Sequence, residues 1–156
     1  MTLTGTETFT AFAKGDGERV RRALIATYGP ELGVEATADA LAYGWEHWAR
    51  IEGMDNPAGY LYRVGRTKAR GRLQRKSALL PNPEESPGNR WVEPGLPGSL
   101  ERLSGKQRAS VVLVHGYGWT YQEVGEVLGI ARSSVQQHVE RGLRHLREDL
   151  GVDVVS

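Results

Sequence analysis

The sequence predicts an all-α protein made of two small helical domains that a proline-rich linker joins. Apolar residues recur every three or four positions along most of the 156 residues, and this spacing places them on one face of a helix. No alternating strand pattern extends beyond a few residues. Five of the seven prolines fall within residues 77–99. Because proline fixes its own φ and cannot donate to a hydrogen-bond ladder, this segment is expected to separate the two domains.

Composition excludes several classes of protein. Lys and Arg number 20 against 19 Asp and Glu, so the net charge alone indicates no partner. The absence of cysteine excludes a disulfide framework and a Cys-ligated zinc site. No signal-peptide pattern opens the chain, and no apolar run approaches the roughly 18 residues of a membrane helix. We therefore expect a cytoplasmic protein that has no membrane partner.

The first domain is expected over residues 8–76. A helical pattern from Glu18 is stopped by Gly29-Pro30, and a longer helix is expected over residues 34–51. Asn56 is suited to cap the next helix, with Pro57 as its first residue, because the missing N–H of proline is not needed there. This helix is expected to reach Lys76.

Cations without acids distinguish the helix that begins at Pro57. Three of its arginines share one stripe, and two tyrosines lie at its start, so the helix is suited to phosphates and to unpaired bases that stack on aromatic rings. The alternative is a solvated face, although unpaired like charges repel one another. The cations are Arg63, Arg66, Lys68, Arg70, Arg72, Arg75 and Lys76, the stripe is Arg63, Arg66 and Arg70, and the tyrosines are Tyr60 and Tyr62.

The preceding helix differs in charge and in aromatic content. Residues 31–55 hold six acids against Arg50 alone, which indicates a protein surface as the partner of this segment. Trp45 and Trp48 share a face with Leu41. Their spacing favours a place in the core over a place against bases.

The second domain, over residues 100–150, contains a helix-turn-helix pattern. Thr120 and Glu123 form a capping box that begins a helix. Gly129 suits the turn because glycine accepts positive φ without strain, and Ile130 can fill the space between the helices. The β-branched stretch 110–114 lies between helical signals and is interpreted as a buried helix.

One face of the second helix of this pattern carries side chains that read DNA. Arg and Gln form bidentate hydrogen bonds with base edges, and Ser bonds to phosphate or base. The alternative is an ordinary solvated helix face. Ala131 stands at the expected N-cap, where Ser133 or Ser134 would serve if the helix began later. The face consists of Arg132, Ser133, Ser134, Gln136, Gln137 and Arg141.

These residues resemble a known family. The stretch "ALAYGWEHWARIEGMDNPAGYLYRVGRTKARGRLQRK" looks like region 2 of a sigma-70 family RNA polymerase sigma factor of the extracytoplasmic-function type. The stretch "LERLSGKQRASVVLVHGYGWTYQEVGEVLGIARSSVQQHVERGLRHLRE" resembles region 4. Together the matches cover about 125 residues, and region 4 carries the more specific pattern.

The resemblance implies a mechanism and a set of partners. The helix from Arg132 to Arg141 would read the promoter −35 element. Region 2 would bind the −10 element and its melted strand through Tyr60, Tyr62, Arg63, Arg66 and Arg70. The helix 35–51 would dock on the β′ clamp helices of core RNA polymerase through Glu35, Asp39, Leu41 and Trp45, and the β flap and an anti-sigma protein are further implied partners.

The chain departs from the family pattern at several positions. Its docking helix has fewer acids than is usual, so that Glu35 and Asp39 remain as the obvious polar contacts. Gly71 stands where the family more often has Asp, and glycine inside a helix costs about 1 kcal/mol relative to alanine.

Two other classes of function were considered. A sigma-like helix-turn-helix regulator or adaptor would bind DNA or polymerase without acting as a full sigma factor. An enzyme is disfavoured, because none of the four histidines has metal-ligand spacing with an acid, and no phosphate loop or Ser/His/Asp elbow is present. We expect no catalytic residue, metal or cofactor.

Overall fold

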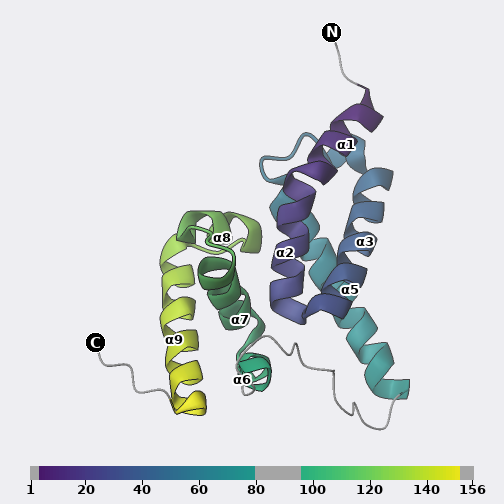
Figure 1. The fold of residues 1–156 in the computed structure, drawn as a ribbon. Helices are drawn as coiled ribbons and strands as arrows, with labels where there is room; N and C mark the ends of the chain where they lie inside the picture. Colours follow the sequence, from purple (N-terminus) through teal and green to yellow (C-terminus); the bar gives the residue numbers. More distant parts are fainter. Residues whose placement is uncertain (1–3, 80–95, 152–156) are drawn as a thin grey trace.

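The computed structural model describes residues 4–79 and 96–151, and every regular element within these ranges is a helix. The all-α prediction is thus confirmed. An N-terminal lobe contains α1 (Gly5–Lys14), α2 (Asp16–Tyr28), α3 (Pro30–Glu46), α4 (Trp48–Ile51) and α5 (Pro57–Leu79). A C-terminal lobe contains α6 (Leu96–Arg102), α7 (Gly105–Val111), the π-helical turn η1 (Val112–Gly116), α8 (Tyr121–Leu128) and α9 (Arg132–Leu150) (Figure 1).

Helices α2, α3 and α5 pack against one another to form the N-terminal lobe. The predicted bounds of the helix over residues 34–51 are wrong at both ends. Helix α3 begins at Pro30, whose fixed φ suits a first helical residue, and it ends at Glu46 because His47 leaves the helical conformation. Helices α2 and α3 also approach closely, since a Cβ at Gly33 would lie 2.5 Å from the Ile25 Cα.

The start of α5 is as predicted. The Asn56 side-chain oxygen accepts a hydrogen bond from the Gly59 backbone N–H at 3.0 Å, which is the N-cap arrangement. The helix continues to Leu79, and α6 begins at Leu96, so the described helices extend beyond the expected linker boundaries at 77 and 99. The rest of the predicted linker, residues 80–95, lies outside the described residues.

The two tryptophans expected in the core have different surroundings. Trp48 is 7% exposed, packs against the rings of Phe9 and Phe12, and donates its indole N–H to the Thr8 hydroxyl at 2.8 Å. Trp45 is 51% exposed, because Phe9 of α1 covers only one edge of its ring. The core prediction is therefore confirmed for Trp48 and wrong for Trp45.

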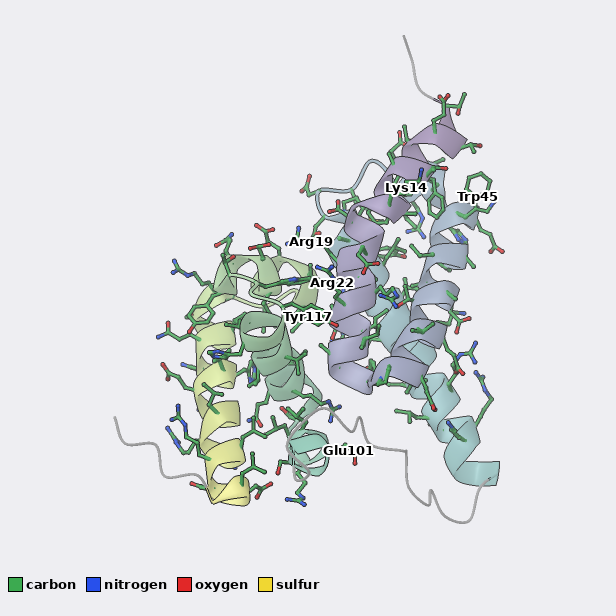
Figure 2. The ribbon with its side chains drawn as sticks, viewed as in Figure 1. Lys14, Arg19, Arg22, Trp45, Glu101 and Tyr117 are labelled. Carbon is green, nitrogen blue, oxygen red and sulfur yellow. The ribbon has the colours of Figure 1, made fainter. Side chains whose placement is uncertain are left out.

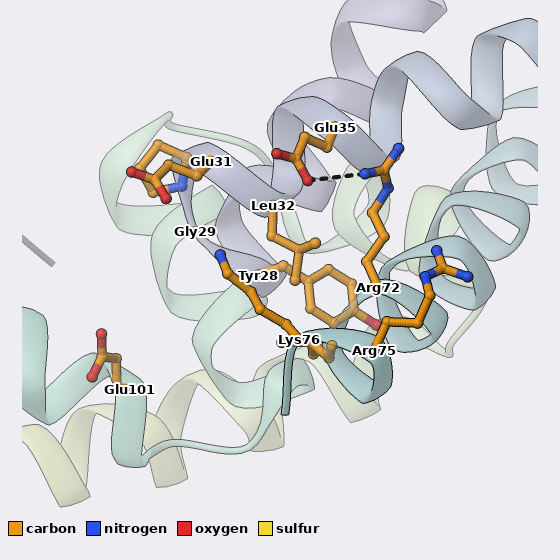
Figure 3. Close-up of a pocket in the computed structure, with 11 residues that line it drawn as sticks. Tyr28, Gly29, Glu31, Leu32, Glu35, Arg72, Arg75, Lys76 and Glu101 are labelled. Carbon is orange, nitrogen blue, oxygen red and sulfur yellow. Dashed lines mark hydrogen bonds and ion pairs between the residues drawn. The ribbon is translucent and has the colours of Figure 1, made fainter. Parts of the chain in front are cut away.

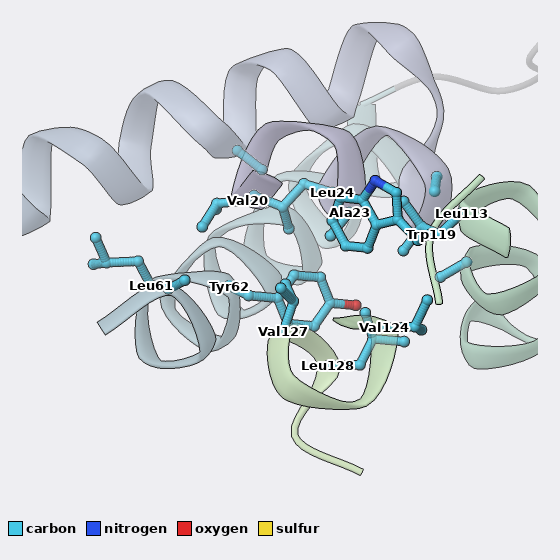
Figure 4. Packing of buried hydrophobic residues seen from close by; sticks show 14 of the residues in the cluster. Val20, Ala23, Leu24, Leu61, Tyr62, Leu113, Trp119, Val124, Val127 and Leu128 are labelled. Carbon is cyan, nitrogen blue, oxygen red and sulfur yellow. The ribbon is translucent and has the colours of Figure 1, made fainter. Parts of the chain in front are cut away.

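The two lobes share one hydrophobic core. Helices α2 and α5 contact α7, η1 and α8, and buried side chains from both lobes form one cluster (Figure 4). The N-terminal lobe contributes Val20, Leu24, Leu61 and Tyr62, and the C-terminal lobe contributes Leu113, Trp119, Val124, Val127 and Leu128. The units expected as two linked domains are thus packed together as lobes.

Two glycines give a stability prediction of opposite sign. A Cβ at Gly71 would meet only the far end of Arg75 at 4.0 Å, so Gly71→Ala should raise the free energy of unfolding by about 0.5–1 kcal/mol. At Gly33 the added carbon would overlap the α2 backbone. Gly33→Ala should therefore lower the free energy of unfolding by about 1–3 kcal/mol. Urea unfolding measures both changes, and a shift of the same sign in both variants would contradict this packing.

Candidate nucleic-acid interface

The predicted helix-turn-helix is present in α8 and α9. Thr120 accepts a hydrogen bond from the Glu123 backbone N–H at 3.1 Å, and the Thr120 N–H donates to the Glu123 carboxylate at 3.2 Å. Both bonds of the capping box are therefore formed. Gly129 has φ of 73° and ψ of 34°, the left-handed conformation that ends α8. These observations confirm the predicted helix start and turn.

The turn between α8 and α9 also requires a second glycine, Gly125, which was not predicted from the sequence. A Cβ at Gly125 would lie 2.6 Å from the Ile130 carbonyl oxygen. The Ile130 N–H in turn donates to the Gly125 carbonyl at 3.1 Å. The backbone of the turn thus rests directly on α8, with Ile130 half-buried against the core as expected.

Helix α9 buries one side and exposes the other. Val135 and Val139 are buried. The opposite side exposes Arg132, Ser133, Gln136, Gln137 and Arg141, with Ser134 half-buried beside them.

The start of α9 has no side-chain cap. Ala131 is its N-cap residue and has extended backbone angles, φ −67° and ψ 148°. The helix therefore does not begin later, as it would if Ser133 or Ser134 were the cap, and both serines lie in its first turn. Their hydroxyls are not engaged in capping α9.

The arginines of the predicted α5 stripe differ in exposure and in their aromatic neighbours. Arg63 is exposed and lies one turn along α5 from Tyr60. Half-buried Arg66 and exposed Arg70 lie near Tyr28, where burial raises the pKa of that tyrosine and the two arginines oppose the rise.

Tyr62 does not have the exposure that base contact requires. It is 2% exposed within the core that the two lobes share. Its hydroxyl lies 2.9 Å from the Thr27 hydroxyl, which donates onward to the Ala23 carbonyl at 2.7 Å. In this arrangement Tyr62 is therefore a core residue and is not exposed for stacking on a base.

Tyr60 belongs to a small surface cluster that the sequence analysis missed. The Arg50 guanidinium donates to the Tyr43 hydroxyl at 3.0 Å and to the Tyr60 hydroxyl at 3.3 Å, and it lies over the Tyr60 ring. Hydrogen bonds from Tyr43 and Arg50 lower the pKa of Tyr60. His47 stacks on Tyr43. The spacing of residues 43, 47 and 50 on one helical face is the signal that could have identified this cluster.

The two acids expected on the docking helix are engaged with α5. Arg72 forms a two-point contact with Asp39, at 2.8 Å and 3.1 Å. It also reaches Glu35 at 3.2 Å (Figure 3). The hydrogen bonds from Arg72 hold the pKa of Asp39 below its usual value. Arg72 is thus paired with acids of α3. Counting the acids within α5 alone does not predict this pairing.

Beside these acids, α3 exposes an apolar strip. Val34 is 44% exposed, Ala38 is exposed, and Leu41 is half-buried. With Trp45, which lies on the outer side of α3 (Figure 2), these residues are spaced three or four apart and so lie on one face. We call Val34, Ala38, Leu41 and Trp45 the α3 strip.

The described residues contain neither a membrane-spanning helix nor a cluster of metal ligands. No helix there is apolar and long enough for a membrane span. Across residues 4–79 and 96–151, no cluster of three or more His, Cys, Asp or Glu side chains has the arrangement of a metal site.

Comparison with known proteins agrees with this geometry. The family model for sigma-70 region 4 matches residues 99–148, which contain α7, α8 and most of α9. The chain is 30% identical over 107 residues to the ECF RNA polymerase sigma factor SigE of Mycolicibacterium smegmatis. Residues 99–148 therefore resemble region 4 of the sigma-70 family, and the longer alignment is similar to an ECF sigma factor. The aligned part makes up 59% of this chain and 42% of SigE, so the chain spans less than half the length of that relative.

A solved structure shows that the likeness in fold extends over both lobes. The sigma factor RpoE of Bartonella quintana, determined in complex with the anti-sigma factor NepR, matches this chain with a TM-score of 0.64. The match covers 94% of this chain and 99% of RpoE, at 18% identity. The fold of the two lobes is therefore similar to the fold of the sigma factor RpoE.

The uncapped start of α9 gives a testable prediction. Ala131→Ser places a hydroxyl at an N-cap with suitable backbone angles and should raise the free energy of unfolding by about 1 kcal/mol. Ala131→Val is the control, since it adds bulk without an acceptor. Thermal and urea unfolding measure the difference, and equal stability of the two variants would contradict this assignment of the cap.

Proposed function

We propose that this protein is a sigma factor that binds core RNA polymerase and directs initiation at promoters with −10 and −35 elements. The observation that carries the proposal is the exposed face of α9. Its Arg, Ser and Gln side chains project from a helix whose other side is anchored in the lobe. A helix held in this way fits the major groove of duplex DNA, where Arg and Gln distinguish base pairs.

The exposed side of α5 supports recognition of a second DNA element. Arg63 is exposed near Tyr60, and Arg50 holds the Tyr60 ring through a cation–π contact. A cation beside a fixed aromatic ring is suited to the phosphate and the face of an unpaired base. We propose that this surface, together with Arg66 and Arg70, contacts the melted −10 strand.

The α3 strip supports docking on polymerase. Contiguous exposed apolar residues rimmed by polar ones mark protein–protein interaction sites, whereas single scattered apolar residues do not. Acids flank the strip, and Arg72 fixes two of them, Glu35 and Asp39, in position. An apolar strip beside oriented acids fits a partner surface that combines apolar and basic side chains. In a sigma factor this partner is the β′ clamp of core polymerase, and region 4 meets the β flap.

One observation favours a second candidate function. Because Arg72 already pairs with Glu35 and Asp39, fewer acids are free for polymerase than the family pattern implies. A sigma-like regulator or adaptor would therefore use α9 on DNA without a productive polymerase complex. It would bind duplex DNA equally well with and without core enzyme, whereas a sigma factor gains affinity and specificity from core enzyme.

An anti-sigma protein is a further proposed partner. The structure that this chain resembles is that of a sigma factor in complex with the anti-sigma factor NepR. Co-purification of the chain from its own cells, followed by a binding assay with each captured protein, tests this partner.

Reconstitution with core RNA polymerase tests the proposed function directly. The chain should form a complex with core enzyme and produce run-off transcripts of defined start from a subset of genomic fragments. Core enzyme alone is the control. A stable complex that yields no transcripts would favour the adaptor. The absence of any complex would reject the sigma factor, and duplex binding that persists without core enzyme would then favour the regulator.

A matched pair of variants tests the docking surface. Ala38→Glu places a charge in the centre of the α3 strip, while Ala11→Glu makes the same change at an exposed position of α1. We expect Ala38→Glu to weaken binding to core polymerase by about tenfold, equal to about 1.4 kcal/mol, because the buried charge has no partner. Ala11→Glu should leave the affinity unchanged. Biolayer interferometry measures both, with melting temperatures as the check on folding.

A second pair of variants distinguishes recognition of base edges by α9 from binding of phosphates by α5. Gln136→Ala should change which base pair is accepted at one −35 position, by about 1–3 kcal/mol. Arg63→Ala should weaken promoter binding across all sequences and lower its salt dependence. Holoenzyme binding to a promoter library at two salt concentrations measures both effects. Identical sequence preference in Gln136→Ala would contradict the placement of α9 in the groove.

A further inference from the structure

An acid lies within the polar face of α9. Glu140 is exposed, and it follows Ser133 by seven residues and Gln137 by three. Residues at these spacings lie one or two turns apart on the same face of a helix. Val135 and Val139, which anchor the helix in the lobe, are on the buried side. Glu140 therefore stands among the side chains that the proposed function turns towards DNA.

One oxygen of the Glu140 carboxylate is occupied by a neighbour on this face. The Gln136 amide nitrogen donates a hydrogen bond to it at 3.2 Å. Because an ionised carboxylate can only accept hydrogen bonds, the nitrogen of Gln136, and not its carbonyl oxygen, must face Glu140. The bond therefore fixes the position of the carboxylate and the orientation of the amide together.

The Glu140 carboxylate keeps acceptor sites that the described part of the chain does not use. Arg144 follows Glu140 by four residues, which is the favourable order and spacing for an ion pair on a helix. No ion pair among the described residues includes Glu140, however. A carboxylate has two oxygens that accept several hydrogen bonds, and Gln136 supplies one of them. The second oxygen is thus left for a donor from outside the protein.

A negative charge at this place opposes general binding to DNA. Duplex DNA carries closely spaced phosphates, so a carboxylate near them lowers the affinity for every sequence. The other exposed side chains of this face are cationic or neutral and favour binding. They are Arg132, Ser133, Gln136, Gln137, Arg141 and Arg144. The acid is therefore compensated only where the duplex presents a hydrogen-bond donor to it.

The major groove presents donors from two bases only. Cytosine offers its N4 amino group and adenine its N6 amino group, whereas guanine and thymine offer oxygen acceptors. Guanine or thymine opposite the carboxylate would bring acceptor against acceptor. Adenine has the acceptor N7 beside its amino group, so it suits a side chain that both accepts and donates. Cytosine presents a donor alone and is the base whose N4 group pairs with Glu.

We propose that Glu140 is a specificity-determining residue of α9, which accepts a hydrogen bond from the N4 amino group of a cytosine in duplex DNA and disfavours guanine and thymine at that position. Gln136 is the positioning residue that holds the carboxylate. The placement of α9 in the major groove rests on the proposed function. The choice of cytosine rests on the acceptor chemistry of Glu140 and its single bond to Gln136.

A second Gln–Glu pair in the chain provides a matched control. On α8 the Gln122 amide donates to the exposed Glu126 carboxylate at 3.3 Å, with the same spacing of four residues. Such pairs also stabilise isolated helices, which is the structural explanation for the α9 pair. Glu126→Gln removes the same charge from the same kind of pair but lies outside the polar face of α9.

Selection from a random duplex pool, followed by sequencing, tests the role of Glu140. The full chain is used with and without core RNA polymerase. The parent should select one position at which cytosine is preferred over guanine by about tenfold. Glu140→Gln should lose most of this preference, because an amide can also donate to guanine. Glu126→Gln should keep the parent preference at every position.

A charge effect alone would have a different result. Glu140→Gln and Glu126→Gln would then raise the affinity for all duplexes alike and leave the selected sequence unchanged, which would overturn the proposal. Both glutamates are exposed, and melting temperatures check that both variants are folded.

A reversal of preference is the more demanding test. Arg donates two hydrogen bonds to O6 and N7 of guanine. Glu140→Arg should therefore replace cytosine by guanine at the same position of the selected sequence. Retention of cytosine in Glu140→Arg would overturn the direct contact.

The contribution of Gln136 is measured with the same pool. Gln136→Ala removes the bond that holds the carboxylate and should weaken the preference for cytosine at the Glu140 position without abolishing it. Loss of that preference in Gln136→Ala but not in Glu140→Gln would assign the contact to Gln136 and overturn the proposal.

The two conditions separate this proposal from the proposed function. Sequence selection by the chain alone, with none in the presence of core enzyme, would reject the sigma factor and still test Glu140. Selection with core enzyme that is unaltered in Glu140→Gln would support the sigma factor and overturn the role of Glu140. The absence of selection under both conditions would overturn both.

Discussion

The apolar packing of α8 against α2 and α5 is the contact that determines the rest of this structure. The chain places two amphipathic helical units in series, and each alone would leave part of an apolar face in water. Joining these faces buries Tyr62 and Val127 in one cluster, and full burial of a side chain such as valine contributes about 1.5–3 kcal/mol. The same contact decides which surfaces remain outside and which are covered.

One side of α9 and one side of α3 remain exposed to solvent, because the opposite side of each helix is packed against other helices. Helix α9 packs its valines on the C-terminal lobe and turns its Arg, Ser and Gln side chains to solvent. Helix α3 packs its small residues against α2 and α5, and Val34, Ala38 and Trp45 of its α3 strip stay exposed. The proposed DNA-reading face and the proposed docking face therefore lie on different helices, which suits the proposed function.

Charge is arranged by contacts between helices rather than along one helix. Arg72 lies on the cationic helix and pairs with Asp39 and Glu35 of the acidic helix. Arg108 serves the carbonyl end of α2 from the other lobe. Arg63 and Arg70 are exposed and Arg66 is half-buried. Arg72 is engaged with acids of α3, so the proposed DNA surface has fewer free cations than the charge pattern of α5 alone indicates.

Local chemistry in the sequence determined the helical class, the N-cap at Asn56, the capping box at Thr120 and the left-handed turn at Gly129. Each depends on residues within a few positions of one another, and so does the exposed polar face of α9. Only the tertiary structure decided the exposure of Trp45, the burial of Tyr62 and the pairing of Arg72, because each depends on a distant segment that covers or neutralises the side chain. Periodicity shows that a helix has an apolar face, but the partner that covers this face is fixed by packing between segments far apart in the chain.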